Sequence, residues 1–135
     1  MTLNGKTRFL AAATLMAFAS TAMLTSARAD IADYEFQLVD AAPRTGEAIL
    51  SVRLVNKKTG KTVPDAVIIA MRIDMAPDGM GTMTSSVEPM PSLEPGIYRF
   101  KADLMMAGGW RLSLGAKVQG ETGTVESKLV FKAGK

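Results

Sequence analysis

The sequence lacks two residue types on which most enzyme and metal chemistry depends. It contains no cysteine and no histidine among its 135 residues. Without cysteine the chain forms no disulfide framework and offers neither a thiolate ligand nor a thiolate nucleophile. Without histidine it has no imidazole base and no Ser-His-Asp triad. These absences exclude most familiar enzyme classes, and we expect a protein that is not an enzyme.

The first 29 residues have the layout of a signal peptide. Two basic residues precede an apolar run over residues 9–24, and small residues surround the expected cleavage site after Ala29. That run is shorter than the roughly 20 apolar residues that a membrane-spanning helix needs, which argues against the alternative of a retained anchor. We therefore expect export to the periplasm and a mature domain of residues 30–135 without a membrane span.

The mature domain also lacks a surplus of charge. The whole chain carries 16 basic and 13 acidic residues, a formal charge of +3. Lys6, Arg8 and Arg28 lie in the signal segment, so the rest of the chain is neutral. Binding to phosphate backbones needs clustered Lys and Arg in excess, and we therefore expect no nucleic-acid partner.

Alternation of apolar and polar side chains predicts β-strands after residue 30. We predict a hairpin across the turn at residues 107–109, between the fourth and fifth strands. In the third strand, alternation places Val67, Ile69, Met71, Ile73 and Met75 on the inward face. The predicted strands cover residues 34–38, 50–54, 67–75, 98–104, 110–118 and 125–131.

The number and spacing of these segments indicate an all-β fold. Six or seven short strands separated by turn residues, with no helical period, favour an immunoglobulin-like antiparallel β-sandwich of about seven strands. A small barrel is the alternative. One domain over residues 30–135 is expected, because about 100 residues can build a sufficient core without disulfides.

Methionine is the residue type with an unusual distribution. Of ten methionines, seven lie after residue 29, and all seven fall within residues 71–106. Residues 75–95 combine four of them with proline, glycine and serine, which predicts a long loop. Oxidisable thioethers in such a loop indicate either burial beneath it or use as ligands.

Thioether sulfur is a soft ligand that selects Cu(I) or Ag(I) over Mg²⁺, Ca²⁺ or Zn²⁺. If the strand ending at Met75 runs toward one end of the sandwich, the strand ending at residue 104 brings Met105 and Met106 to that same end. We predict Met80, Met83 and Met106 as ligands, with Met75 and Met105 as further candidates.

Trp110, the only tryptophan, follows this methionine pair by a tight turn, and its aromatic face could cover a bound cation. Trp110 and Met75 also fall on inward strand positions, so packing in the core is the alternative for both. Met71 is predicted to be a core residue. The carboxylates in and around the loop match no calcium-binding spacing and are predicted to be solvated. They are Asp74, Asp78, Glu88 and Glu94.

Two stretches carry a resemblance to a known family. A strand and a Met/Pro/Gly-rich loop are followed by Glu94-Pro95-Gly96-Ile97-Tyr98-Arg99-Phe100 and then by Leu104-Met105-Met106-Ala107-Gly108-Gly109-Trp110-Arg111-Leu112. This order resembles the FixH and YtkA-like family of small exported or membrane-anchored domains, over roughly residues 46–132.

The resemblance implies an immunoglobulin-like sandwich with a role around copper, either as an accessory factor for copper-oxidase assembly or as a companion of heavy-metal efflux systems. The Met-rich stretch over residues 75–83 fits the efflux-associated members better. The expected absence of a retained membrane helix departs from the assembly members. The resemblance supplies no enzymatic residues.

Two functional hypotheses follow. The first is a periplasmic protein that binds Cu(I) or Ag(I) through methionines and passes the ion to a periplasmic or membrane partner, an efflux or copper-assembly component. The second is a metal-free interaction module whose Met-rich loop docks a partner protein, because methionine surfaces repack easily.

Overall fold

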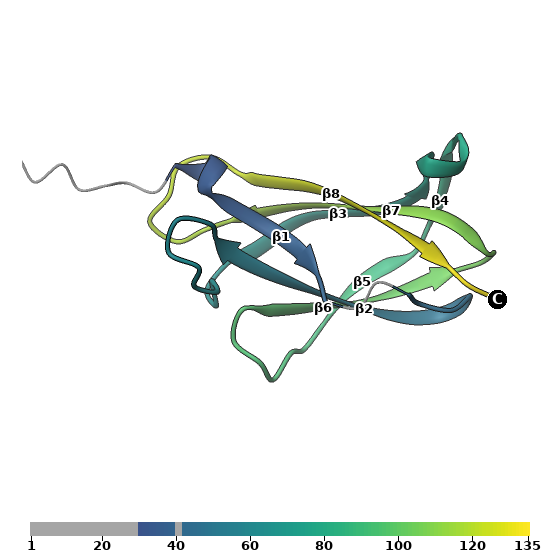
Figure 1. Ribbon diagram of the computed structural model, residues 1–135, viewed down its shortest axis with the longest axis horizontal. Coiled ribbons are helices and arrows are strands. Elements are labelled where there is room, and N and C mark those ends of the chain that lie inside the picture. The colour runs from purple at the N-terminus through teal and green to yellow at the C-terminus, as the bar shows by residue number, and fades with distance from the viewer. Residues whose placement is uncertain (1–29, 40–41) are drawn as a thin grey trace, which may run out of the picture.

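The computed structural model describes residues 30–39 and 42–135, which form eight strands and two short 3-10 turns (Figure 1). The expected signal segment and its cleavage site lie outside these residues. The strands are β1 (Tyr34–Leu38), β2 (Gly46–Asn56), β3 (Val67–Met75), β4 (Met80–Ser85), β5 (Val87–Met90), β6 (Ile97–Leu104), β7 (Gly108–Lys117) and β8 (Val125–Ala133). The turns are η1 (Ile31–Asp33) and η2 (Ala76–Asp78).

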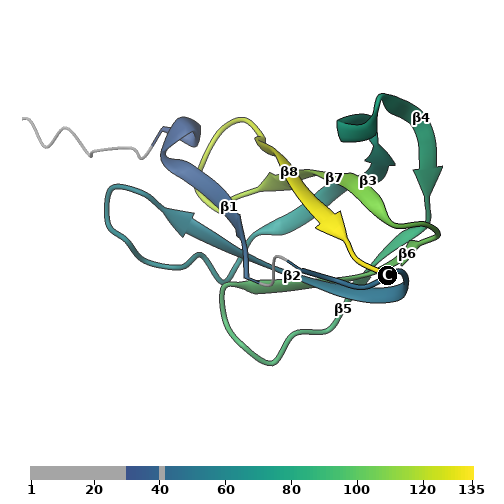
Figure 2. The same ribbon diagram turned by 45° about the vertical axis from the view of Figure 1, so that its right-hand side comes forward.

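The strands build two four-stranded sheets that face each other, as Figure 2 shows from a second angle. One sheet has the order β1-β2-β6-β5 and the other β4-β3-β7-β8, and neighbouring strands are antiparallel. This is the ABED and CFG arrangement of immunoglobulin domains, with β4 added beside β3. The predicted immunoglobulin-like sandwich is confirmed, and because the two sheets stay open the barrel alternative is wrong.

The predicted hairpin between the strands on either side of residues 107–109 is wrong. β6 pairs with β2 and β5, whereas β7 pairs with β3 and β8 in the opposite sheet. The connection at residues 105–107 therefore crosses from one sheet to the other. Alternation shows which face of a strand is buried, and it carries no information on which strand lies beside it.

The predicted long loop over residues 75–95 is also wrong in part, because it contains β4 and β5. β4 pairs with the end of β3, and β5 pairs with β6. Both strands are short, and they are built from Gly, Thr, Ser and Pro among the methionines, so they lack the apolar alternation by which strands are recognised. Pro89 is tolerated in β5 because β5 lies at the edge of its sheet.

The inward face predicted for β3 is correct only in its second half. Val67 is 61% exposed and Ile69 is 53% exposed, whereas Ile68 packs against the core. The register with β7 shifts between Ile68 and Ala70, which marks a β-bulge. A bulge adds one residue to the strand, so the side chains before it point to the opposite faces from those that the alternation predicts. Met71 is partly buried and packed against the core, as predicted.

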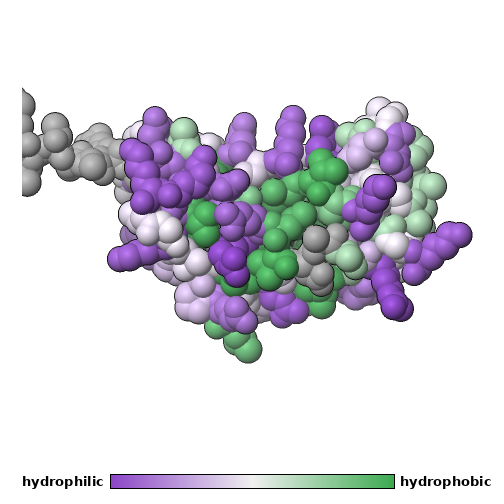
Figure 3. Space-filling view, in the orientation of Figure 1, coloured by the Kyte–Doolittle hydropathy of each residue, from purple (hydrophilic) through white to green (hydrophobic). Residues whose placement is uncertain are grey.

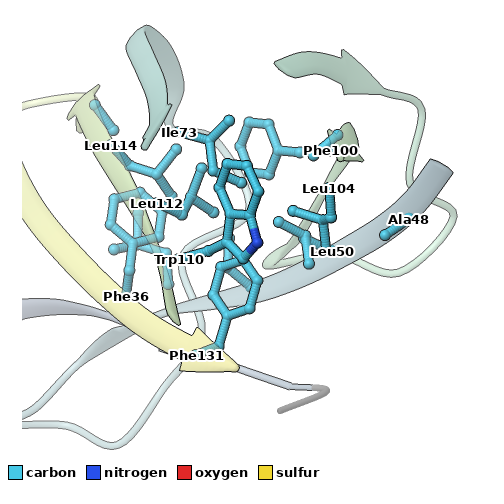
Figure 4. Packing of buried hydrophobic residues seen from close by; sticks show 14 of the residues in the cluster. Phe36, Ala48, Leu50, Ile73, Phe100, Leu104, Trp110, Leu112, Leu114 and Phe131 are labelled. Carbon is cyan, nitrogen blue, oxygen red and sulfur yellow. The ribbon is translucent and has the colours of Figure 1, made fainter. Parts of the chain in front are cut away.

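The core fills the space between the sheets. Figure 4 shows Trp110 of β7 in the middle of the cluster, with Phe131 of β8 on one side and Ile73 of β3 and Phe100 of β6 on others. Trp110, Ile73 and Phe100 are each fully buried. On the face seen in Figure 3, apolar side chains gather between β1 and β8 and are surrounded by hydrophilic ones. Among the described residues, no helix is long and apolar enough to cross a bilayer.

Candidate functional site

Two segments that carry the candidate ligands meet at one end of the sandwich, where β3 and β6 end (Figure 1). The first runs over residues 75–83 through η2 into β4 and carries three of the methionines. The second runs over residues 105–110, from the end of β6 into β7, and carries the other two together with the tryptophan. We call these two segments the methionine end.

A side-chain hydrogen bond joins the two segments. The backbone N–H of Gly109 donates to the carboxylate of Asp78, with 2.9 Å between the two atoms. The two glycines at this point leave room for the contact, because a Cβ on Gly109 would lie 2.7 Å from Cβ of Pro77, and one on Gly108 would lie 3.0 Å from Cε of Met75. The double glycine therefore allows η2 to lie directly on the start of β7.

The five candidate methionines lie at different depths in this end of the domain. Met75 is fully buried, and Met80, its partner in the β3–β4 ladder, is partly buried against the core. Met83 is likewise partly buried. Met105 is 53% exposed and Met106 is 40% exposed. The methionine end thus offers partly buried thioethers from β4 and accessible ones from the β6–β7 connection.

Trp110 is a core residue, which confirms the packing alternative for this side chain. It is fully buried, and its indole Nε1–H donates to the backbone carbonyl of Met106 at 3.0 Å. This bond satisfies the one polar group of the ring and fixes the connection that carries Met105 and Met106. Contact between the indole face and a bound cation stays a prediction.

The prediction that Asp74 is solvated is wrong. Asp74 is fully buried, and its Oδ2 accepts hydrogen bonds from Arg72 Nε and Arg111 Nη2, each at 3.1 Å. Its Oδ1 accepts from the N–H of Ala76 at 2.9 Å, and Arg72 Nη2 donates to the carbonyl of Gly81 at 2.8 Å. Asp74 therefore anchors the first segment of the methionine end to β3 and β7.

The electrostatics of Asp74 follow from these contacts. Burial by itself raises the pKa of this carboxyl group. The hydrogen bond from Ala76 and the two guanidinium groups favour the ionised form more strongly, so the pKa of Asp74 lies below its usual value. The carboxylate is therefore charged at neutral pH and acts as a structural counter-ion.

The carboxylates of the described residues do not form a second kind of metal site. Among residues 30–39 and 42–135, no group of three or more acidic side chains is placed to hold a metal ion. Glu88 and Glu94 are exposed, as predicted, and Asp78 is exposed although its carboxylate holds Gly109. A metal hypothesis for this part of the chain depends on the thioethers.

The residues that organise the methionine end were missed by sequence reasoning. Asp74 occupies an outward strand position, and nothing in its spacing identifies the arginine on β7 that neutralises it. One available signal was the arginine two positions earlier, because Arg72 and Asp74 share a strand face. The role of Asp78 depends on contact between residues 31 positions apart along the chain.

Replacing Asp74 with asparagine is expected to lower the free energy of unfolding by about 2 kcal/mol at pH 7, because hydrogen bonds to a charged group are lost inside the protein. The folded-state pKa is lowered, so this stabilisation is complete above about pH 4 and is lost as the pH falls through the folded-state pKa. Urea unfolding followed by Trp110 fluorescence measures both effects. The wild type and the variant should converge at low pH, and a constant difference from pH 7 to pH 2 would contradict the assignment.

Two solved structures are distantly similar to this chain. The filamin domain of Lin-41 is 18% identical with a TM-score of 0.45, over 78% of this chain and 93% of that one. A conjugative transposon lipoprotein from Bacteroides eggerthii is 11% identical with a TM-score of 0.35, over 73% of this chain and 96% of that one. Likenesses of this size carry no information on ligands or partners.

Comparison of sequences gives a firmer result. No curated protein matches the chain. The sequence profile of the YtkA-like family, however, matches residues 28–115, well over half of the chain. The matched region covers β1 to β6 and most of β7, and includes both segments of the methionine end. This chain belongs to the YtkA-like family.

Proposed function

We propose that this protein is a periplasmic carrier of Cu(I) or Ag(I) that binds the ion through methionine thioethers at the methionine end. It would pass the ion to a membrane or periplasmic partner in a heavy-metal efflux or copper-enzyme assembly system, a setting that the resemblance to FixH and YtkA-like proteins implies. Under this proposal the metal ion is cargo, and the protein performs no chemical step on it.

One observation carries the proposal. Five methionines come from two segments that residues 84–104 separate in the sequence, and the fold joins these segments through Asp78 and Gly109. Met80 and Met83 reach this end from β4, and Met106 reaches it from the β6–β7 connection, whose backbone is held by Trp110.

The donor set fits a soft monovalent ion. Thioethers are neutral and need no deprotonation, so binding to them is not opposed by protons in the way that thiolate or imidazole binding is. They offer little to hard divalent ions. Met105 and Met106 are the more exposed methionines, so under this proposal an ion would meet them first and then pass to the less exposed Met80 and Met83.

A titration of the chain from residue 30 onward with Ag(I), in the presence of a competing chelator, tests the proposal. We expect one ion to bind with a Kd well below micromolar, and methyl NMR signals of Met80, Met83 and Met106 to shift while that of Met71 does not. Binding no tighter than micromolar, or shifts spread evenly over all methionines, would overturn it.

A metal-free interaction module is the second candidate. The observation that favours it is the exposure of Met105 and Met106, which puts two large apolar side chains at the surface next to each other. Flexible methionine side chains adapt to partner surfaces without any ion. In that case a partner would be captured equally well in the presence and absence of a Cu(I) chelator, whereas a carrier that docks with its ion would lose capture.

A further inference from the structure

One edge of the sandwich is open over residues 67–72 of β3. β7 pairs with β3 on one side from Val67 to Asp74, whereas β4 pairs on the other side only from Ile73 onward. Within the described part of the chain, no strand pairs with the outer edge of Val67–Arg72, although β5 of the other sheet passes close to β3. Four of these six residues are exposed. Their outward backbone groups are therefore free to pair with another strand.

Two other edge strands, β5 and β8, carry features that usually prevent such pairing. β5 has only four residues and contains Pro89, which cannot donate to a ladder. β8 carries the charged residues Glu126, Lys128 and Lys132 on its outward positions. The open part of β3 has neither proline nor charge before Arg72. Its one protective feature is the bulge between Ile68 and Ala70.

A groove lies beside the start of this edge. Its volume is about 410 Å³, and its lining includes Ile68 of β3, Pro89 and Met90 of β5, and Phe100 of β6. Leu93, which is 98% exposed, also borders it. The groove can accept an apolar side chain from a segment that runs along β3.

We propose that an extended segment of a partner protein pairs with β3 along Val67–Arg72 and becomes a new strand at the edge of the β4-β3-β7-β8 sheet. Backbone hydrogen bonds would supply affinity, and an apolar side chain in the groove beside Ile68 would supply specificity. We assign the antiparallel direction, because every strand pair in this sheet is antiparallel.

The charges at the two ends of the edge define the partner further. At one end, the guanidinium groups of Arg72 and Arg111 share the single carboxylate of Asp74, which leaves one positive charge uncompensated. Nε of Arg111 is buried with no hydrogen-bond partner among the described residues. At the other end Asp65 is exposed and forms no ion pair with the described residues. An antiparallel segment complements this pattern when an acidic residue precedes its uncharged centre and a basic residue follows it.

A second copy of this chain matches the charges of the edge, because Asp65, the uncharged residues after it and Arg72 follow the same order, but it leaves the groove unfilled. In a symmetric pairing of two β3 strands, the inward side chains Ile68 and Met71 of each copy stay in their own sandwich. Neither copy would then fill the groove of the other. The surface therefore matches a foreign peptide, and self-association is an outcome that the experiment must distinguish.

The test uses a synthetic peptide, acetyl-Glu-Thr-Val-Thr-Ile-Thr-Lys-amide, and the isotopically labelled chain from residue 30 onward without metal. We expect saturable shifts of the backbone amide signals of Val67–Arg72 and of residues that line the groove. A peptide with its two charged ends exchanged should bind several-fold more weakly, and one with N-methylated backbone amides should not bind.

Ile69→Lys places a charge on the open edge at an exposed position and should weaken peptide binding at least tenfold. Val130→Lys is the matched control, because Val130 is 60% exposed on β8, away from the edge, and it should bind as the wild type does. The proposal is overturned if the peptide causes no shifts at millimolar concentration, or if Ile69→Lys binds it equally well. It is replaced by self-association if the chain alone dimerises through this edge and Ile69→Lys abolishes the dimer. None of these outcomes depends on metal binding.

Discussion

Replacing Met80, Met83 and Met106 together with leucine is expected to weaken Ag(I) binding by at least about 100-fold, which corresponds to a loss of about 2.7 kcal/mol of binding free energy. Leucine has nearly the volume of methionine and no sulfur, so the change removes the ligands while largely preserving the packing. All three positions are partly buried or exposed, which limits the cost in stability. The measurement is a competition titration with a chelator of known Ag(I) affinity.

The matched control replaces Met71 and Met90 with leucine. Both lie outside the methionine end, one in β3 and one in β5, and both are partly exposed. This control should bind Ag(I) as tightly as the wild type. If the triple variant also retained wild-type affinity, thioether ligation at Met80, Met83 and Met106 would be wrong, and the metal-free interaction module would be the better explanation of the exposed methionines.

The strands were predictable because apolar and polar side chains must alternate along a strand that has one buried face. Apolar side chains recur at every second position along Tyr98–Leu104 and Trp110–Val118. In both segments the structure buries the side chains that this pattern places inward. The meeting of the two methionine segments followed from strand direction alone. Two strands that finish at the same end of a sandwich bring the segments that follow them close together, even when the strands belong to different sheets.

The failures share a physical cause, which is that they depend on contacts between residues distant in the sequence. The assignment of β6 and β7 to different sheets is decided by the whole set of strand pairings. The burial of Asp74 depends on Arg111, 37 positions later, and on the covering β3–β4 connection. Alternation in β3 fails at Ile69 because a bulge is a property of two paired strands.

Truncation of Trp110 to alanine is expected to have the largest effect on stability of any single substitution in this domain. The indole is fully buried in the middle of the core, and Trp→Ala changes at such sites cost about 3–5 kcal/mol. A domain of this size is stable by only about 5–15 kcal/mol, so the loss would bring it close to unfolding. Urea unfolding followed by far-UV circular dichroism measures it, because the variant has lost the only tryptophan.

Trp110→Phe separates packing from positioning. Phenylalanine keeps an apolar ring in the core and removes the Nε1–H that donates to the carbonyl of Met106, which should cost about 1–2 kcal/mol plus part of the packing. If this hydrogen bond positions the connection that carries Met105 and Met106, Ag(I) affinity should also fall several-fold under conditions where the variant is fully folded. Unchanged affinity would mean that the indole supports the fold alone and that the connection is held in place by Asp78 and Gly109.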